Sequence, residues 1–370
     1  MAVYAHINTV PNGSTGGIMM KEHKELLAVG EDSYAFWGRG REAENANEMR
    51  FASNLEVKLD VLQTRLDGKA GFHSKAATKR LLARLDEIAP DVVHLHNLHG
   101  YYANVEMLFE WLATRECKVE WTLHDCWAFT GHCAYFTYVK CAQWQSHCAY
   151  TNRCPQLDTY PKTYSKAACS WNFEQKKRLF NLVSVDRMKL IAPSQWLADL
   201  VGESFLSKYP VEVCHNTIDT SVFKPTPSDF RERYGIGDRF MILGVASPWT
   251  ERKGLADFVR LARDLDSEKY AIVLVGLSEK QVREMPEGVV GLVRTDSREE
   301  LVDIYSTADM FFNPTVEDNY PTVNLEAEAC GTPVVTYDTG GCAETVRRGD
   351  SRVVAGYGGA LSYLKERQSL

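Results

Sequence analysis

The segment from Asn313 to Glu344 constrains the fold of this chain more than any other stretch. A short apolar run ends at its start, the helical run LEAEAC follows, and the break GTP leads into a second apolar run, VVTY. This succession predicts two parallel strands joined by a helix. Loops that follow parallel strands meet at one edge of the sheet, which is where open α/β sheets bind ligands.

Acidic residues and glycines occupy the loops of this segment. Asp318 follows the first strand, Glu326 stands beyond seven intervening residues at the start of the helix, and Gly340 and Gly341 follow the second strand. A carboxylate can accept hydrogen bonds from two neighbouring hydroxyls, while glycine lets backbone amides approach a phosphate. We therefore predict that these residues form one ligand site.

The same alternation of strands and helices runs through the rest of the chain. A polar stretch with prolines, TIDTSVFKPTPSD, separates two such series, so the 370 residues suit two domains. We expect an α/β fold with two Rossmann-like domains, residues 1–220 and 221–370, whose parallel sheets face each other across a cleft. Residues 126–170 interrupt the first series as an insert rich in Cys, Trp, Tyr and His.

Bulk composition excludes several classes of protein. A net charge of −7 is unsuited to general binding of nucleic acid. No run approaches the roughly 18 apolar residues that a membrane helix needs. The N-terminal stretch lacks the basic flank and apolar core of a secretion signal. Ten cysteines without a disulfide-type spacing favour a reducing compartment, so we expect a cytoplasmic protein.

Two cations lie where a phosphate could bind. Arg252 and Lys253 stand between the predicted strand MILGVAS and the predicted helix LADFVRLARDL. A cation pair beside a helix start can neutralise the charge that develops on a departing diphosphate. In the first half, Gly16 and Gly17 follow the first strand, but their loop lacks the lysine of a nucleoside-triphosphate site and the spacing of a dinucleotide site.

Histidines close two predicted strands of the first half. His94 and His96 share one face of the strand in DVVHLHNLHGYY, and His99 lies in the loop behind it. A metal site and ordinary packing at a strand end both remain open for these histidines, although no carboxylate stands at a spacing that matches a metal site. His124 and Asp125 end another apolar strand, WTLHD, and are expected at the same edge of the sheet.

The run DNYPTVNLEAEACGTPVV resembles the signature of the retaining glycosyltransferases of family 4, which have the two-domain GT-B fold. In that signature two glutamates are separated by seven residues, and here Asp318 takes the place of the first. The segment VASPWTERKGL is similar to the donor-phosphate loop of the family, with Ser247 where the family usually has Gly-Arg. The resemblance spans nearly the whole chain and extends to members that build colanic acid and capsules.

The resemblance implies roles for residues of both domains. Those implied to be catalytic are His124, Asp125, Arg252, Lys253 and Asp318. Those implied to bind the donor are Gly16, Gly17, Arg252, Lys253, Asp318, Asn319, Glu326, Gly340, Gly341 and Glu344. His96 and His99 are expected to contact the acceptor. His124 would lie beside the transferred sugar, and Asp125 would orient it or accept a proton from the acceptor hydroxyl.

The implied activity is transfer of a hexose, with retention, from a nucleotide-diphosphate sugar to a lipid-linked or oligosaccharide acceptor in surface polysaccharide synthesis (capsular or exopolysaccharide). No cofactor is expected for catalysis. The stretch WNFEQKKRLF is a candidate for peripheral contact with the cytoplasmic face of the inner membrane. Two alternatives remain open: a silent subunit that binds a nucleotide sugar, suggested by the replacement of Glu by Asp318, and a nucleotide-sugar epimerase with the same fold.

Cysteines are concentrated in the insert. Cys133, Cys141, Cys148 and Cys154 lack the CxxC spacing of a zinc knuckle, but the insert resembles the Cys-rich insert of the capsule- and colanic-acid-type members. A structural zinc bound by these four residues and a set of buried reduced thiols are both open interpretations.

Overall fold

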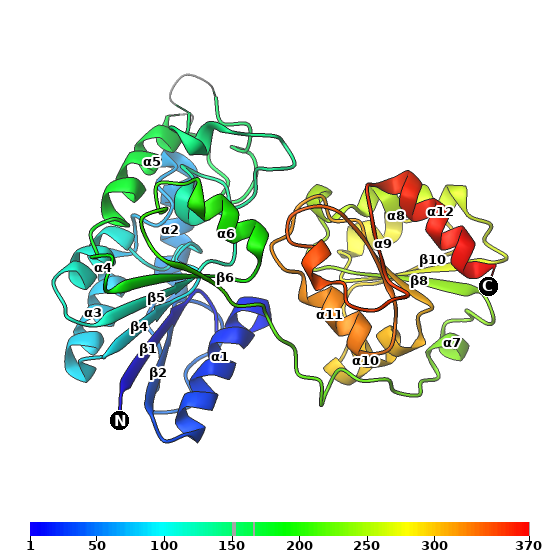
Figure 1. Ribbon diagram of the computed structural model, residues 1–370, viewed down its shortest axis with the longest axis horizontal. Helices are drawn as coiled ribbons and strands as arrows, with labels where there is room; N and C mark the ends of the chain where they lie inside the picture. Colours follow the sequence, from blue (N-terminus) through cyan, green and yellow to red (C-terminus); the bar gives the residue numbers. More distant parts are fainter. Residues whose placement is uncertain (150–152, 166, 370) are drawn as a thin grey trace. The chain divides into compact units, whose positions relative to one another are not determined.

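The computed structural model describes residues 1–149, 153–165 and 167–369, and its chain divides into two compact units, Met1–His215 and Asn216–Leu370 (Figure 1). The division falls at the start of the polar stretch in which the sequence predicts a domain boundary. Each unit is built on one parallel sheet with helices packed against it. The fold is therefore the predicted pair of Rossmann-like α/β domains.

The sheet of the N-terminal unit has seven strands in the order β3-β2-β1-β4-β5-β6-β7. Its strands are β1 (Val3–Asn8), β2 (Asp32–Trp37), β3 (Glu48–Arg50), β4 (Val92–Leu95), β5 (Lys118–Thr122), β6 (Met188–Ala192) and β7 (Val211–Val213). Its helices are α1 (Gly13–Ala28), α2 (Asn54–Asp67), α3 (Lys75–Ile88), α4 (Val105–Ala113), α5 (Ala168–Leu179) and α6 (Gln195–Gly202), with the 3-10 turns η1 (Trp127–Phe129) and η2 (Gln143–Gln145). The strand order reverses between β1 and β4, which marks the switch point where such sheets bind ligands.

The sheet of the C-terminal unit has six strands in the order β10-β9-β8-β11-β12-β13. Its strands are β8 (Phe240–Val245), β9 (Tyr270–Val275), β10 (Val289–Leu292), β11 (Met310–Asn313), β12 (Val334–Tyr337) and β13 (Arg352–Val354). Its helices are α7 (Phe230–Arg233), α8 (Leu255–Asp264), α9 (Glu279–Glu284), α10 (Arg298–Thr307), α11 (Thr322–Ala329) and α12 (Tyr357–Gln368), with the 3-10 turns η3 (Glu251–Lys253) and η4 (Ala343–Thr345). Here the switch point lies between β8 and β11.

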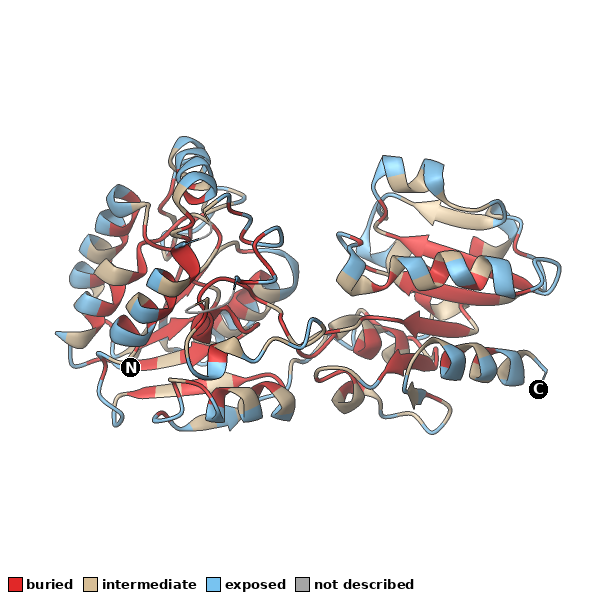
Figure 2. Ribbon diagram, turned by 90° about the horizontal axis from the view of Figure 1, so that it is seen from above, coloured by how far each residue is buried: buried red, intermediate tan, exposed pale blue. Residues whose placement is uncertain are grey.

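Both faces of the C-terminal sheet are covered by apolar side chains. Successive side chains of a strand point to opposite faces, so Met241 and Leu243 join one buried cluster while Ile242 joins the other. Burial on both faces explains why the strands are uninterrupted apolar runs. Figure 2 shows the same layering, with buried strands and helices whose outer sides are exposed.

The sequence locates most of these elements but not all of their limits. The loop predicted from GSTGG is already helical, because α1 begins at Gly13. The helix predicted from KKRLFNLV lies earlier, as α5, so the predicted insert includes the first residues of a regular helix. Within the described residues, no helix combines the length and the apolar character needed to cross a membrane.

Candidate functional site

Three loops meet at the switch point of the C-terminal unit. The loop after β8 carries Arg252 and Lys253 in η3, the loop after β11 carries Asp318, and the loop after β12 carries Gly340 and Gly341. The strands β8, β11 and β12 are neighbours in the sheet, so these loops leave it side by side. Residues far apart in sequence are thereby brought together as predicted.

Asp318 holds both cations of the site. Lys253 Nζ donates a hydrogen bond to Asp318 Oδ2 at 2.5 Å, and Arg252 Nη1 lies 3.7 Å from the same oxygen. Arg252 Nη1 also donates to the carbonyl oxygen of Glu317. Burial favours the neutral acid, but the charges of Lys253 and Arg252 outweigh it and lower the pKa of Asp318. The three side chains therefore form an ionised cluster with one net positive charge, which suits a phosphate ligand.

Glycine at position 340 is required for the contact between two of these loops. Gly340 has φ +57°, and a Cβ there would lie 2.0 Å from the carbonyl oxygen of Asp318. The backbone N–H of Gly341 donates to the same carbonyl at 2.9 Å. The glycine pair thus packs on the backbone that carries Asp318. The amide of Gly341 consequently holds a protein carbonyl, whereas the sequence suggested that glycine amides here would approach a phosphate.

Glu326 and Glu344 lie on the helical elements that follow the same loops. Glu326, on α11, is half-buried, and its Oε2 accepts a hydrogen bond from Tyr305 Oη at 3.0 Å. Burial raises the pKa of Glu326, and the hydrogen bond from Tyr305 opposes that rise. Glu344 lies in η4, where its carbonyl accepts from Tyr320 Oη at 3.4 Å. The amide of Asn319 donates to Asp318 Oδ1 at 2.9 Å, which fixes the start of the segment that leads to α11.

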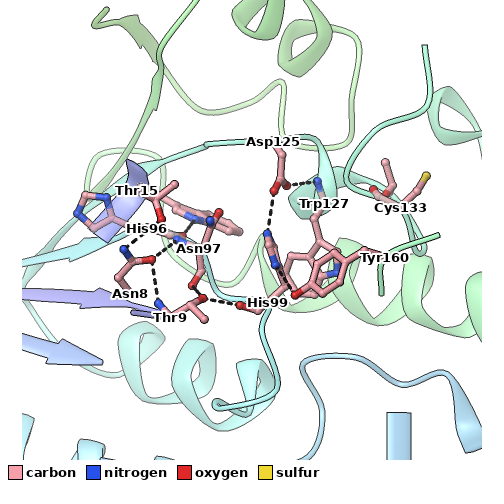
Figure 3. Close-up of polar contacts among 12 residues, drawn as sticks. Asn8, Thr9, Thr15, His96, Asn97, His99, Asp125, Trp127, Cys133 and Tyr160 are labelled. Carbon is pink, nitrogen blue, oxygen red and sulfur yellow. Dashed lines mark hydrogen bonds and ion pairs between the residues drawn. The ribbon is translucent and has the colours of Figure 1, made fainter. Parts of the chain in front are cut away.

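In the N-terminal unit a small pocket forms where β4 and β5 end. It is lined by His96, Asn97, Leu98, His99, Trp121, Thr122, Leu123, His124, Asp125, Trp127 and Ala128. Figure 3 shows His99 between Asp125 and Tyr160, with Nε2 at 2.8 Å from Asp125 Oδ2 and Nδ1 at 2.9 Å from Tyr160 Oη. Asp125 Oδ1 accepts from the amide of Trp127 at 2.9 Å.

The pairing of Asp125 differs from the prediction. Its hydrogen-bond partners are His99 and a backbone amide, so Asp125 orients His99 and not the adjacent His124. Burial would raise the pKa of Asp125, but His99 outweighs it and lowers the pKa, which keeps the carboxylate ionised. The sequence does not predict this pairing, because His99 follows β4, Asp125 follows β5, and only the sheet order shows that these strands are neighbours.

His96 and His124 both line this pocket and are linked to each other. His96 Nδ1 lies 3.1 Å from His124 Nε2. Burial lowers the pKa of His124 to about 4, so its ring is neutral near pH 7. His96 is only 1% exposed although it lines the pocket, and its contact with an acceptor stays a prediction. The side chain of His99 is 12% exposed and also remains a candidate for that contact.

The glycines after β1 have different surroundings. A Cβ on Gly16 would lie 2.6 Å from the carbonyl oxygen of Val10, whereas one on Gly17 would meet nothing within 4 Å. Gly16 is thus required for the close return of the chain, and Gly17 leaves open surface at the start of α1. Asn8 Oδ1 fixes the preceding loop by accepting from the amides of Thr9 at 2.8 Å and Asn97 at 3.3 Å (Figure 3).

The four cysteines predicted as zinc ligands line one small pocket. Its lining residues are Thr130, His132, Cys133, Phe136, Cys141, Gln143, Trp144, Cys148, Ala149, Cys154 and Pro155. The thiol of Cys154 hydrogen-bonds with those of Cys133 and Cys169, and all ten cysteines of the chain are free thiols. Both ring nitrogens of His132 are buried without a hydrogen-bond partner in the described part of the chain. Thiols are preferred ligands of structural zinc, and Cys169 is a fifth thiol of this region that the spacing did not indicate.

The stretch WNFEQKKRLF is only partly exposed, with Trp171, Lys177 and Arg178 at the surface, and its contact with a membrane stays a prediction. Phe173, Lys176 and Phe180 are buried. Lys176 Nζ donates to the carbonyl oxygens of Trp127 at 2.8 Å and Thr130 at 3.1 Å, so this cation fastens α5 to the insert. Exposed apolar side chains also follow one face of α2: Leu55, Leu59, Leu62 and Leu66.

Comparison with known proteins agrees with this architecture. A profile of the family described as glycosyl transferases group 1 matches residues 239–362, which lie in the C-terminal unit. The putative colanic acid biosynthesis glycosyl transferase WcaC of Escherichia coli K12 is 22% identical over 369 residues, covering 93% of this chain and 84% of WcaC.

Solved structures share the fold at low sequence identity. The sucrose-phosphate synthase of Thermosynechococcus elongatus superimposes with a TM-score of 0.73 at 15% identity, covering 100% of this chain and 90% of that chain. Anabaena HepE in complex with UDP-glucose gives a TM-score of 0.62 at 14% identity, covering 100% and 89%. The chain therefore has the GT-B fold of these structures, and its C-terminal unit is similar to the group 1 glycosyltransferases.

Proposed function

We propose that the protein transfers a hexose, with retention, from a nucleoside-diphosphate sugar to a hydroxyl of a glycan or lipid-linked acceptor during surface polysaccharide synthesis. The observation that carries the proposal is the ionised cluster of Arg252, Lys253 and Asp318 at the switch point of the C-terminal sheet. The structure of HepE with UDP-glucose and the naming of WcaC for colanic acid support the choice of donor and pathway class.

In this proposal each charged side chain of the donor site has one task. Arg252 and Lys253 neutralise the diphosphate as its bond to the sugar breaks, and Asp318 holds both cations in place. Glu326, oriented by Tyr305, accepts hydrogen bonds from the ribose hydroxyls. The departing phosphate oxygen takes the proton of the attacking hydroxyl, so that attack and departure occur on the same face of the sugar.

The acceptor is assigned to the N-terminal unit. His99 lies at the rim of the pocket and is held by Asp125 on one side and Tyr160 on the other. A neutral His124, fixed by His96, presents an uncharged polar ring at the base of the same pocket. These groups can hydrogen-bond sugar hydroxyls and orient one of them for attack.

A thermal-shift panel of nucleotide sugars tests the donor assignment. Because a ligand that binds only the folded state raises Tm, the correct donor is expected to raise it in wild type. Glu326→Ala is expected to abolish the shift, while the matched variant Glu366→Ala, on the exposed side of α12, retains it. An unchanged shift in Glu326→Ala refutes the ribose assignment.

Product analysis separates the proposal from its two alternatives. A transferase releases nucleoside diphosphate and lengthens a supplied acceptor, and nuclear magnetic resonance of the product reports whether the anomeric configuration is retained. An epimerase yields an altered nucleotide sugar without acceptor. A silent subunit binds the donor but gives no product with any acceptor.

We propose a structural zinc for the insert, bound by Cys133, Cys141, Cys148 and Cys154. Their shared pocket and the lack of disulfides support this assignment. Zinc content of the purified protein is expected to fall in Cys148→Ser, together with Tm. Equal zinc content and Tm in Cys148→Ser and wild type refute it.

A lipid-linked acceptor also requires contact with a membrane surface, and we assign this contact to the leucines of α2. Leu59→Lys combined with Leu62→Lys is expected to abolish co-sedimentation with phospholipid vesicles. Val29→Lys, which changes a more exposed apolar residue of the same unit, is the control. Vesicle binding that is absent in wild type, or unaffected by the leucine changes, contradicts the assignment.

A further inference from the structure

Four ligand-type side chains converge beneath α1, outside the donor site. They are His6 on β1, Glu22 on α1, and His94 and His96 at β4. One ligand atom from each lies within 4.8 Å of all the others. His6 and His94 are register partners on adjacent strands, and His96 follows on the same face of β4. Three imidazoles from the sheet therefore meet one carboxylate from the helix that covers it.

Several of these atoms lack hydrogen bonds. Glu22 Oε2, His96 Nε2 and both ring nitrogens of His6 are buried and have no hydrogen-bond partner among the described residues. Buried polar atoms of folded proteins are almost always paired, since an unpaired one destabilises the folded state. A group of such atoms directed at one point indicates a ligand that pairs with all of them.

The remaining ring nitrogens of two histidines are already engaged. His94 Nε2 lies 2.8 Å from Thr122 Oγ1, and His96 Nδ1 lies 3.1 Å from His124 Nε2. This leaves His94 Nδ1 and His96 Nε2 directed at Glu22, at 3.1 and 3.6 Å from its Oε2. A histidine that binds a metal through one nitrogen typically donates a hydrogen bond through the other. Both histidines have this arrangement.

We propose that His6, Glu22, His94 and His96 bind one divalent transition metal ion, with zinc as the expected metal. Four ligands at the zinc distances of 2.0–2.1 Å place tetrahedral ligand atoms about 3.3 Å apart. Glu22 Oε2 lies 3.1, 3.6 and 3.8 Å from the nitrogens of His94, His96 and His6, which bracket that value. A set dominated by imidazole favours zinc over magnesium or calcium, which prefer oxygen.

Burial supports the same assignment. His6 and His96 are both 1% exposed, so a metal ion bound to them would be shielded from solvent. Four protein ligands complete a tetrahedral shell, which is typical of a structural and not a catalytic zinc. The ion would join α1 to β1 and β4. It would also fix the proton of His96 on Nδ1, so that His96 donates to His124 Nε2 at the base of the acceptor pocket.

Cobalt titration tests this site separately from the cysteine pocket. The full-length protein, stripped of metal and carrying Cys148→Ser and Cys154→Ser, is titrated with Co²⁺ while its visible absorption is recorded. Tetrahedral cobalt bound by nitrogen and oxygen gives d–d bands without the charge-transfer band of a thiolate. We expect such bands at one equivalent of cobalt.

Two variants of α1 identify the ligands. Glu22→Gln is expected to weaken cobalt binding at least tenfold and to remove the rise in Tm that zinc produces. Glu25→Gln changes an exposed residue of the same helix and is expected to alter neither. The metal-free Tm of both variants reports whether each one folds. Absence of d–d bands, bands accompanied by thiolate charge transfer, or equal cobalt affinity in the two variants overturns the proposal.

Discussion

Replacement of Gly340 by alanine tests the geometry of the donor site most directly. The new Cβ would lie 2.0 Å from the carbonyl oxygen of Asp318, while real Cβ contacts are essentially never closer than 3.0 Å. The loop that carries Asp318 must therefore move by about 1 Å. The left-handed backbone at φ +57° adds about 1–2 kcal/mol for a residue with a Cβ. Relief of the clash adds about 1–3 kcal/mol, so the free energy of unfolding should fall by at least about 2 kcal/mol.

That loss is measurable in two ways. For a unit of this size it lowers Tm by about 4 °C or more. A displacement of about 1 Å in catalytic geometry can lower the rate up to about 100-fold, so the rate of sugar transfer should fall at least about tenfold. The control is Gly349→Ala, since a Cβ there meets nothing within 4 Å and its φ lies outside the left-handed region. If both variants match wild type in Tm and transfer rate, the contact between Gly340 and Asp318 does not support the site.

Three further predictions concern single hydrogen bonds. Tyr305→Phe removes the hydrogen bond that opposes the rise in the pKa of Glu326, so the pKa of Glu326 should rise further. In calorimetric titrations at decreasing pH, the variant should therefore lose donor affinity at a higher pH than wild type. An unchanged pH midpoint of this loss contradicts the prediction. Asp318→Asn should lower the free energy of unfolding by about 1.5–3 kcal/mol at neutral pH. The pKa of Asp318 is lowered in the folded state, so its contribution to stability is present above the unfolded pKa of about 3.9 and is lost as pH falls through the folded pKa. The free energies of unfolding of wild type and variant, measured with urea, should therefore converge in acid. Asp125→Asn, which loosens His99, should slow transfer at least about tenfold while leaving the donor-induced rise in Tm intact.

The convergence of residues at the proposed donor site could be predicted from sequence because these residues stand at the ends of predictable elements. Apolar runs locate β8, β11 and β12, and any residue just after a parallel strand must reach the same edge of the sheet. That rule places Lys253 near Asp318 without knowledge of any contact. It does not reveal that Asp318 binds both cations, or that the amide of Gly341 holds the Asp318 carbonyl, because these depend on how two loops pack.

Other features could not be predicted because no local pattern encodes them. The strands β3 and β13 have three residues each, too few to show a period. The stretch around Lys176 has the composition of a surface helix, yet its ammonium group is held by carbonyl oxygens of the insert, an irregular segment. Composition reports which residues can be exposed, whereas tertiary contacts decide which ones are.

The histidine cluster is a second kind of feature that local sequence patterns do not encode. A search along the chain for a carboxylate at a suitable spacing from His94 and His96 finds none, because spacing predicts ligands only within one element. At the switch point β1 lies beside β4, so His6 pairs with His94 although their strands are separated by β2 and β3 in sequence. The helix that returns from β1 then brings Glu22 over the same histidines. A site built across a switch point therefore draws its ligands from the strands on both sides of the reversal and from the crossover helix. Polar residues that face one side of such strands should be compared with each other before a metal site is dismissed.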